Sequence, residues 1–355
     1  MSVKAGVIGY GYMGNYHIRK CNDKDDFDVI GVYNIHPEKC EDIPEKYPNN
    51  TIRCYSTLQE FLDDKEIELV FICTPNNFHK ELSIACLKAG KSVMSEKPVT
   101  MNLQELDDIL AVADEEHKVF TVHQNRRWDP DFLVVKKVVD SGEIGKVTNI
   151  ISCVHGQRGV CFGWRADPEA GGGMLYDWGI HLIDQMLQLF PDNKVNSIYA
   201  RMLSVLTPAV DDYFELKLTF DNNVCATILV ATFALQDRPR WYVYGDRGTL
   251  KLDDFSGKKG GAAKIKRDVA GFDSVFSKAP MGPSRTMSPL QPEFIENIPL
   301  PEVEENFHEY HRNLAEAVKG NEEQYVTHRD MRRAMMIVDN AFISAEKNEV
   351  IKIEI

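Results

Sequence analysis

A short apolar run followed at once by three spaced glycines constrains the fold of this chain more than any other feature of its sequence. Val3–Ile8 reads as a strand, and after it come a glycine-rich turn, a helical pattern (Asn15–Asn22) and a second strand pattern (Asp28–Tyr33). A G-x-G-x-x-G pattern alone is weak evidence, but between a strand and a helix it indicates a dinucleotide-binding turn. Glycine lets the backbone approach a pyrophosphate, and the helix N-terminus offers unpaired N–H groups to that anion. The residues expected to contact the cofactor are Gly9, Gly11, Tyr12, Met13 and Gly14.

The end of the second predicted strand bears on which dinucleotide is bound. An acidic residue that bonds the ribose of NAD is expected there, but the sequence has Asn34. Asparagine can bond a ribose hydroxyl, yet it lacks the charge that repels a 2′-phosphate, and His36 and Lys39 are close enough to favour one. NAD is the expected cofactor, and NADP stays open as the alternative.

Strand and helix patterns continue to alternate as far as residue 124. Further strands are expected at Ile52–Tyr55, Leu69–Cys73, Ser92–Ser95 and Val119–His123, and further helices from Thr57, at Phe78–Ala89 and at Asn102–His117. Apolar strands that alternate with helices predict a parallel sheet covered on both faces, so residues 1–124 are expected to form a Rossmann domain. Ligands of such sheets bind beyond the carboxyl ends of the strands. The polar residues at those ends are therefore expected in the cofactor site: Thr74, Pro75, Asn76, Glu96, Lys97 and Gln124.

Lys97 follows an apolar strand and precedes Pro98, which restricts its backbone and allows a cis bond. A lysine in a cleft can lose part of its proton affinity and serve in proton transfer, or direct its charge at a substrate oxygen. The alternative is a surface lysine paired with Glu96.

Residues 171–173 are glycines that lead into a mostly apolar helical pattern. Asp177, His181, Asp184 and Gln188 recur at i, i+4, i+7 and i+11, which lines them along one stripe of the helix. A mostly apolar helix is buried, so a carboxylate and an imidazole on it need partners or a water-filled cavity. In the alternative interpretation, Asp177 caps the helix and His181 is a core residue. The glycines are expected to let the chain pass close to the nicotinamide, and Asp184 and Gln188 stay unassigned.

Five segments resemble the Gfo/Idh/MocA oxidoreductases (glucose–fructose oxidoreductase, inositol dehydrogenase and relatives) in order and spacing, over essentially the whole chain. They are GVIGYGYMG at the start, CTPNNFH at 73–79, SEKPVT at 95–100, HQNRRWDPDF at 123–132 and GGGMLYDWGIHLID at 171–184. The resemblance implies an α/β fold, with a Rossmann domain followed by an α/β domain that has a large, mostly antiparallel sheet. It implies sugar-like, polyol or inositol substrates, and Lys97, Asp177 and His181 as the catalytic residues. The segment CTPNNFH adds His79 to the expected cofactor site. Asn34 departs from the family pattern, because many NAD-using members have Asp at that position.

Residues 125–355 are expected to form the second domain, which binds substrate. Helices are predicted at Pro130–Asp140, Phe307–Lys319 and His328–Lys347, and strands at Lys146–His155, Val195–Met202, Asp212–Phe220, Val224–Phe233, Arg240–Tyr244, Gly248–Leu252 and Val350–Ile355. Consecutive strands without intervening helices predict an antiparallel sheet. A partner subunit commonly covers the second face of such a sheet, so a homodimer or homotetramer through this sheet is expected. Residues 254–300 lose periodicity and are either an arm or lid or a plain loop.

Aromatic and guanidinium groups suit sugars, which offer C–H faces for stacking and hydroxyls for hydrogen bonds. Trp164 and Arg165 lie close to the glycine run, although a solvated loop is an equal interpretation of each residue taken singly. The residues expected to bind substrate are Asn125, Arg126, Trp164, Arg165, Asp177 and His181.

Composition excludes several classes of protein. The 54 acidic residues outnumber the 41 basic ones and give a net charge of −13, which argues against binding nucleic acid or an anionic membrane. Eight cysteines without a C-x-x-C spacing argue against zinc and against a disulfide framework. No metal site is expected, because His308, His311 and His328 have no companion carboxylate pattern. With no signal-peptide or membrane-spanning pattern, a cytoplasmic protein is expected.

These patterns together predict an NAD(P)-dependent oxidoreductase that transfers a hydride between a carbinol carbon and nicotinamide. His181 is expected to act as general base, Asp177 to hold its imidazole, and Lys97 to stabilise the developing charge on oxygen. Within the family, the alternative is an enzyme that oxidises glycosides with a tightly held, recycled NAD(H). An alternative of another class is a non-catalytic NAD(P)-binding sensor.

Overall fold

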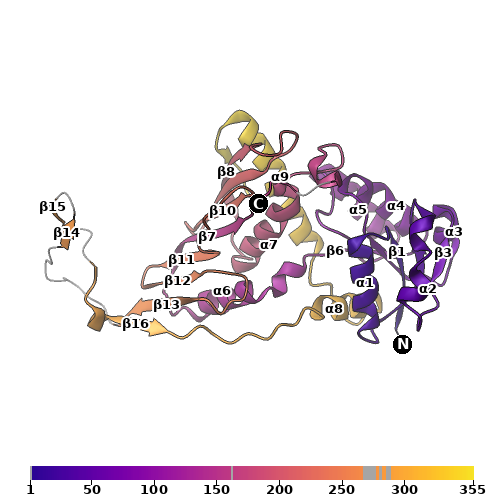
Figure 1. The fold of residues 1–355 in the computed structure, drawn as a ribbon, viewed down its shortest axis with the longest axis horizontal. Coiled ribbons are helices and arrows are strands. Elements are labelled where there is room, and N and C mark those ends of the chain that lie inside the picture. Colours follow the sequence, from indigo (N-terminus) through magenta and orange to yellow (C-terminus); the bar gives the residue numbers. More distant parts are fainter. Residues whose placement is uncertain (1, 161–162, 267–276, 280–281, 285–288) are drawn as a thin grey trace.

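A computed structural model describes residues 2–160, 163–266, 277–279, 282–284 and 289–355 of the chain, which form two sheets with their helices (Figure 1). The first sheet consists, within the described residues, of six parallel strands in the order β3-β2-β1-β4-β5-β6. Their bounds are β1 (Val3–Ile8), β2 (Phe27–Tyr33), β3 (Arg53–Tyr55), β4 (Leu69–Ile72), β5 (Ser92–Ser95) and β6 (Phe120–Val122). This is the strand order of a Rossmann fold, as the glycine turn after β1 predicted.

Helices connect these strands: α1 (Tyr12–Asn22), α2 (Ile43–Lys46), α3 (Leu58–Asp63), α4 (His79–Lys88) and α5 (Leu103–Glu115). Because such crossovers are right-handed, α1 lies on one face of the sheet, and α4 and α5 lie on the other. The direction of crossing reverses between β1 and β4, which pair directly with Ile8 opposite Ile72. The turns after these two strands therefore meet at the switch point where Rossmann folds bind their ligands.

The second sheet has, in the described part of the chain, nine strands in the order β16-β13-β12-β11-β7-β10-β9-β8-β17. The bounds of the longer strands are β7 (Val147–His155), β8 (Val195–Leu203), β9 (Tyr213–Phe220), β10 (Cys225–Ala231), β11 (Trp241–Gly245) and β12 (Gly248–Leu252). All neighbours are antiparallel except β7 and β10, which run parallel. The predicted fold class, a Rossmann domain with a mostly antiparallel second sheet, is confirmed.

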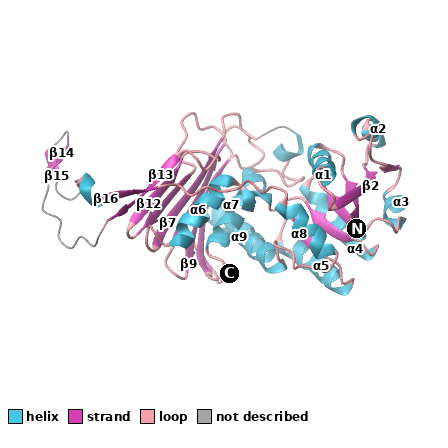
Figure 2. Ribbon diagram, turned by 90° about the horizontal axis from the view of Figure 1, so that it is seen from below, coloured by secondary structure: helices cyan, strands magenta, loops and turns pink. Residues whose placement is uncertain are grey.

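Helices cover one face of the second sheet, the face turned toward the first (Figure 2). They are α6 (Pro130–Ser141), α7 (Ile180–Leu189) and α9 (His328–Lys347). Inward side chains of the strands, such as Ile228 and Leu216, are fully buried under these helices. No helix of the described chain lies on the opposite face. A further helix, α8 (Glu309–Val318), instead packs beside α1 in the Rossmann half (Figure 1).

Two features of the second half differ from the predictions. Part of 254–300 is neither arm nor loop, because β13 (Gly260–Ile265) and β16 (Ile295–Ile298) extend the sheet. Gly260 hides the strand pattern: it packs so closely on β12 that an added Cβ would lie 2.0 Å from the Lys251 carbonyl oxygen. A short hairpin of β14 (Ser277–Ala279) and β15 (Gly282–Ser284) follows, while 267–276, 280–281 and 285–288 lie outside the described residues. The last strand is shorter than predicted, because the regular ladder of β17 spans Ile351–Lys352. Beyond it, Ile353 and Ile355 still donate backbone hydrogen bonds to the carbonyl oxygens of Asn196 and Val195.

Within the described residues, no helix combines the length and the apolar character needed to cross a bilayer.

Candidate active site

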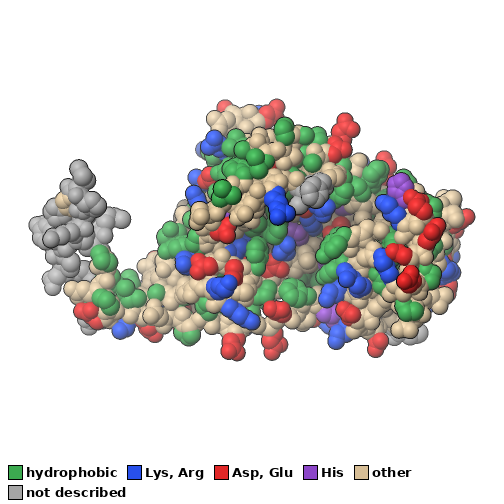
Figure 3. Space-filling model, in the orientation of Figure 1, with side chains coloured by type: hydrophobic (Ala, Val, Ile, Leu, Met, Phe, Trp, Pro, Cys, Tyr) green, Lys and Arg blue, Asp and Glu red, His purple; other side chains and the backbone are tan. Residues whose placement is uncertain are grey.

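A cleft of about 270 Å³ lies where the two halves meet. Figure 3 shows basic side chains gathered around the hollow between them. Its walls are formed by Tyr12, Met13, Cys73, Asn76, Glu96, Lys97, His123, Asn125, Arg126, Trp164, Arg165, Asp177, Trp178 and His181. The cleft therefore brings together residues from every predicted segment. Gly9, Gly11, Gly14, Asn34, Thr74, Pro75, His79 and Gln124 belong to the predicted site but do not line this cleft.

The glycine turn at the start of α1 fits a dinucleotide pyrophosphate. Gly9 has φ +96° and packs so tightly on the end of β4 that a Cβ would lie 2.6 Å from the Cys73 carbonyl oxygen. Gly11 is the N-cap of α1, makes no side-chain cap, and would present an added Cβ to open space. The first N–H groups of α1 thus face room for an anion. Tyr12 is 80% exposed beside them, where it can cover a bound ligand.

The end of β4 supplies further polar groups. The buried Asn76 donates from Nδ2 to the Gly171 carbonyl oxygen at 2.7 Å, which ties the two halves together. Its Oδ1 and the Thr74 hydroxyl are buried and have no hydrogen-bond partner in the described chain. Of the two residues only Asn76 lines the cleft, so its Oδ1 is the better placed to accept from a ligand. His79 is different: its buried ring contacts the carbonyl oxygens of Pro98 (2.8 Å) and Thr74 (3.1 Å). His79 therefore braces these loops from behind.

Lys97 is partly buried and lies within the cleft, not on the open surface. Its peptide bond to Pro98 is cis. Its Nζ donates to Asp177 Oδ1 at 2.7 Å and to the Asp177 carbonyl oxygen at 2.8 Å, and Arg165 Nε lies 3.4 Å from the same Oδ1. Burial alone would raise the pKa of Asp177, but Lys97 and Arg165 outweigh it and hold that pKa below its ordinary value. Asp177 is therefore ionised and shared between two cations.

Asp177 lies in a π-helical turn, Leu175–Gly179, that precedes α7. Such turns occur frequently at functional sites, and here the wider turn aims Asp177 across the cleft at Lys97. Asp211 holds the start of this turn, since its Oδ2 accepts the Leu175 N–H at 2.8 Å. An added Cβ on Gly173 would meet Asp211 Oδ1 at 2.1 Å, and one on Gly171 would meet Met101 Sδ at 2.5 Å. Protein atoms therefore fill the space beside these two glycines, and the expectation that they let the chain pass close to nicotinamide stays a prediction.

His181 is oriented by Gln124, and the expectation that Asp177 holds its imidazole is wrong. His181 Nδ1 lies 3.1 Å from Gln124 Oε1. An amide oxygen only accepts, so Nδ1 carries the proton and Nε2 keeps its lone pair. Burial, together with the charges of Lys97 and Arg126, lowers the pKa of His181 well below its ordinary value. Asp177 is drawn away by Lys97, and His181 remains a neutral base.

Asp184, the next residue of the polar stripe, is structural. Arg127 donates to it in a bidentate pair, from Nε at 2.8 Å and from Nη2 at 2.6 Å. Both side chains are almost fully buried, so each charge depends on the other. The stripe thus divides into Asp177 and His181 at the cleft and Asp184 in the core, and Gln188 is only partly buried.

The wall facing Lys97 is aromatic and basic. The Arg126 guanidinium lies 4.1 Å from the centre of the Trp178 ring, and Arg165 lies 4.5 Å from that of Trp164. Trp178 was not predicted as a site residue, although its position next to Asp177 is the signal that could have indicated it. Asn34 lies apart at the end of β2, where its side chain is bonded to the His36 carbonyl oxygen at 3.0 Å.

Comparisons with known proteins place both halves of the chain in one family. Residues 3–124 match a family model described as "Oxidoreductase family, NAD-binding Rossmann fold", and residues 132–251 match the GFO/IDH/MocA C-terminal domain. The scyllo-inositol 2-dehydrogenase (NADP(+)) IolW of Bacillus subtilis is 27% identical over 99% of this chain and 96% of its own. The oxidoreductase YhhX of Escherichia coli is 31% identical over 70% of this chain and 71% of its own.

Solved structures extend the comparison to the whole fold. An NAD-binding protein from Listeria innocua superimposes with a TM-score of 0.92 at 34% identity, over 99% of both chains. The match therefore includes both sheets. The chain therefore belongs to the Gfo/Idh/MocA oxidoreductases, a family with an NAD-binding Rossmann fold.

Proposed function

We propose that this protein oxidises a secondary hydroxyl of an inositol or a sugar to the ketone, with NAD(P)⁺ as the acceptor, and that it also catalyses the reverse reaction. One observation carries the proposal: His181, with its Nε2 lone pair free, lines the same cleft as the ammonium group of Lys97. A base and a cation that converge on one oxygen are what the removal of a carbinol proton requires.

Three residues of the cleft have separate roles in this reaction. His181 Nε2 accepts the hydroxyl proton, and Lys97 Nζ donates a hydrogen bond to the same oxygen as negative charge develops on it. Asp177 positions Lys97 and accepts a hydrogen bond from a neighbouring substrate hydroxyl. Bound NAD(P)⁺ supplies the acceptor for the hydride that leaves the carbinol carbon. The carbon–oxygen double bond forms as proton and hydride depart, so atoms and electrons balance.

The opposite wall of the cleft suits a cyclic polyol. Trp164 and Trp178 offer ring faces for the C–H surface of a cyclic polyol, and Arg126 and Arg165 offer donors for its hydroxyls. Two similar proteins bear matching names, the scyllo-inositol 2-dehydrogenase of Bacillus subtilis and a myo-inositol 2-dehydrogenase of Thermotoga maritima. Inositols are therefore the first substrates to test.

The test is a panel of inositols, free aldoses and methyl glycosides, each with NAD⁺ and with NADP⁺, followed by the absorbance of reduced nicotinamide. Turnover of an inositol or a free sugar is expected, and it should fall at least 100-fold in Lys97→Met. Glycoside oxidation without net release of reduced cofactor would instead select the enzyme type that recycles its NAD(H). Tight cofactor binding with no turnover across the panel would select the sensor.

A further inference from the structure

Behind the Lys97 side of the cleft, four buried side chains meet from four different elements. His17 lies on α1, Glu96 follows β5, His123 follows β6 and His311 lies on α8. Their exposed fractions are 0%, 6%, 1% and 0%. The catalytic scheme above assigns no role to the three imidazoles.

Glu96 fixes the proton positions of two of the rings. Its Oε1 accepts from His17 Nε2 at 2.8 Å and from His123 Nδ1 at 2.9 Å. A carboxylate only accepts, so both of those nitrogens carry hydrogen. The lone pairs therefore lie on His17 Nδ1 and His123 Nε2.

The third ring completes the arrangement. His311 Nε2 lies 3.1 Å from His17 Nδ1. His17 Nδ1 carries a lone pair, so His311 Nε2 donates to it, and the lone pair of His311 is on Nδ1. Neither His311 Nδ1 nor His123 Nε2 has a partner in the described chain. Two buried imidazole lone pairs without a donor are costly, at about 1–3 kcal/mol each. One nitrogen from each of the three rings can be chosen so that all three lie within 4.8 Å of one another.

We propose that His17, His123 and His311 bind a divalent transition-metal ion, Zn²⁺ or an ion of similar ligand preference, with Glu96 as the outer carboxylate. A histidine ligand commonly donates its second N–H to a carboxylate, which is what His17 and His123 do with Glu96. Two nitrogens at about 2.0–2.1 Å from a tetrahedral ion lie roughly 3.3 Å apart, close to the His17–His311 separation of 3.1 Å. The ion would take the lone pairs of His17 Nδ1, His123 Nε2 and His311 Nε2, with the proton of the His311 ring on Nδ1, and it would give His123 Nε2 the partner that it lacks.

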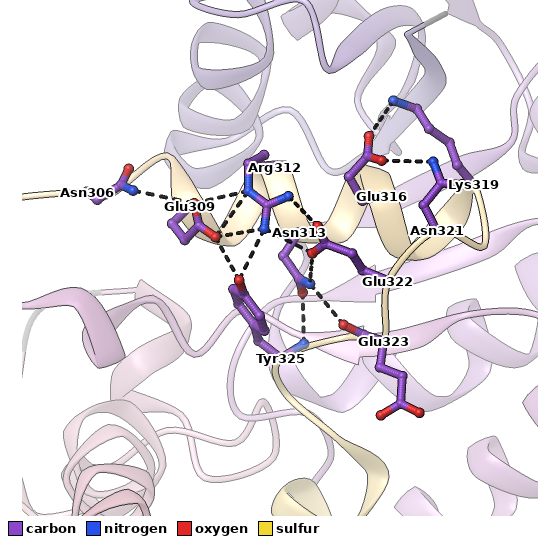
Figure 4. Close-up of polar contacts among 10 residues, drawn as sticks. All are labelled: Asn306, Glu309, Arg312, Asn313, Glu316, Lys319, Asn321, Glu322, Glu323 and Tyr325. Carbon is purple, nitrogen blue, oxygen red and sulfur yellow. Dashed lines mark hydrogen bonds and ion pairs between the residues drawn. The ribbon is translucent and has the colours of Figure 1, made fainter.

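The residues around the three histidines suit an ion that links α1, the end of β6 and α8. The carboxylate of Glu96 offsets part of the added charge, and His17 stacks on Phe71 with a ring separation of 5.0 Å. His123 and Glu96 also line the cleft, so two members of the cluster border the catalytic site. The helix that carries His311 is held from its other side by Arg312, which bonds Glu309, Glu322 and Tyr325 (Figure 4). The ligand ring is thereby presented from a fixed helix.

No metal site was expected from the sequence. The ligands are at positions 17, 123 and 311, so no short spacing in the sequence indicates them. The cluster is a consequence of the fold, which brings α1, the end of β6 and α8 together.

The test is a titration of chelator-treated protein with Co²⁺, read by its visible absorption, together with metal analysis after Zn²⁺ loading and gel filtration. One equivalent is expected, with the strong bands of a tetrahedral nitrogen site. His311→Gln and His17→Gln should each weaken binding at least 10-fold. Two controls should retain it: His328→Gln, which changes a histidine on α9 outside the cluster, and His181→Asn, which removes the histidine of the catalytic cleft.

Circular dichroism identifies any variant that has lost its fold. The visible absorption of the Co²⁺-loaded wild-type protein tests the site even if every variant fails to fold. No stoichiometric Co²⁺, or Co²⁺ with the weak bands of an octahedral site, would overturn the proposal. Binding that survives in both cluster variants, or that is lost in His181→Asn alone, would overturn it too. None of these readouts uses turnover, so the result is independent of the proposed oxidoreductase reaction.

Discussion

Lys97 Nζ lies 2.7 Å from Asp177 Oδ1, an ion pair between the loop that ends β5 and the π-helical turn that precedes α7. The two residues are 80 positions apart and belong to different halves of the molecule. Both residues line the cleft, as His181 does. The catalytic group therefore combines Lys97 from the Rossmann half with Asp177 and His181 from the second half.

Replacing Lys97 by Met removes the ammonium group and keeps much of the side-chain volume. We expect kcat to fall by about 10²–10⁴-fold, because no cation then stabilises the developing oxyanion. The affinity for the dinucleotide, measured by fluorescence titration, should change much less. Equal losses in dinucleotide affinity and turnover would assign Lys97 to cofactor binding alone. Lys80→Met, on the surface of α4, is the matched control.

Gln124→Glu tests how His181 is oriented. A carboxylate at this position would still accept the Nδ1 proton, but its charge would stabilise imidazolium and raise the pKa of His181. The acid limb of the kcat/KM profile should therefore move to higher pH than in the wild type. Gln124→Leu, which accepts nothing, should lower kcat without that shift. An unmoved profile in the Glu variant would remove His181 from the role of base.

Asn34→Asp tests cofactor choice at the end of β2. The added carboxylate would repel a 2′-phosphate and accept from ribose hydroxyls, so the kcat/KM ratio of NAD⁺ to NADP⁺ should rise at least 10-fold. Asn22→Asp, which adds the same charge at the far end of α1, should leave the ratio unchanged. A ratio unaffected in Asn34→Asp would place the 2′-position of the ribose elsewhere.

Acid should destabilise the fold through its buried neutral imidazoles. Burial lowers the pKa of His79 and of His181 below that of an unfolded histidine. As pH falls through about 6.5, the unfolded chain binds protons that the native state does not. The free energy of unfolding should therefore fall by up to about 1.4 kcal/mol per pH unit for each of the two groups. Urea unfolding between pH 7.5 and roughly 5 measures this, and His79→Gln should show a smaller slope than the wild type.

We propose that the open face of the second sheet binds a second copy of the chain. On this face Tyr242 and Tyr244 lie side by side on β11, with ring centres 4.7 Å apart, and Ile151 lies next to them on β7. Tyr242→Glu with Tyr244→Glu should convert an oligomer to a monomer in light scattering. Lys88→Glu, on the surface of α4, should not. A wild-type protein that is monomeric at micromolar concentration would contradict the proposal.

Local patterns determined the parts of this protein that depend on neighbouring residues. The helix predicted at His328–Lys347 has those bounds, because Thr327 and Asp330 form a capping box at its start and Asn348 ends it in the left-handed conformation. The strand, glycine turn and helix at residues 3–22 likewise follow from short-range periodicity and turn chemistry. The resemblance to the family also predicted that a domain with a mostly antiparallel sheet follows the Rossmann domain.

Only the tertiary structure decided which side chains meet. Gln124 and His181 are 57 positions apart, as are Arg127 and Asp184, and His17 and His311 are 294 apart. A helical stripe places Asp177, His181 and Asp184 on one line but leaves their partners open, since those come from other elements. Gly260 conceals the start of β13 for the same reason, because β12 fills the space that a side chain would occupy. Periodicity acts over a few residues, whereas burial and hydrogen bonding at the site depend on contacts that exist only once both sheets have folded.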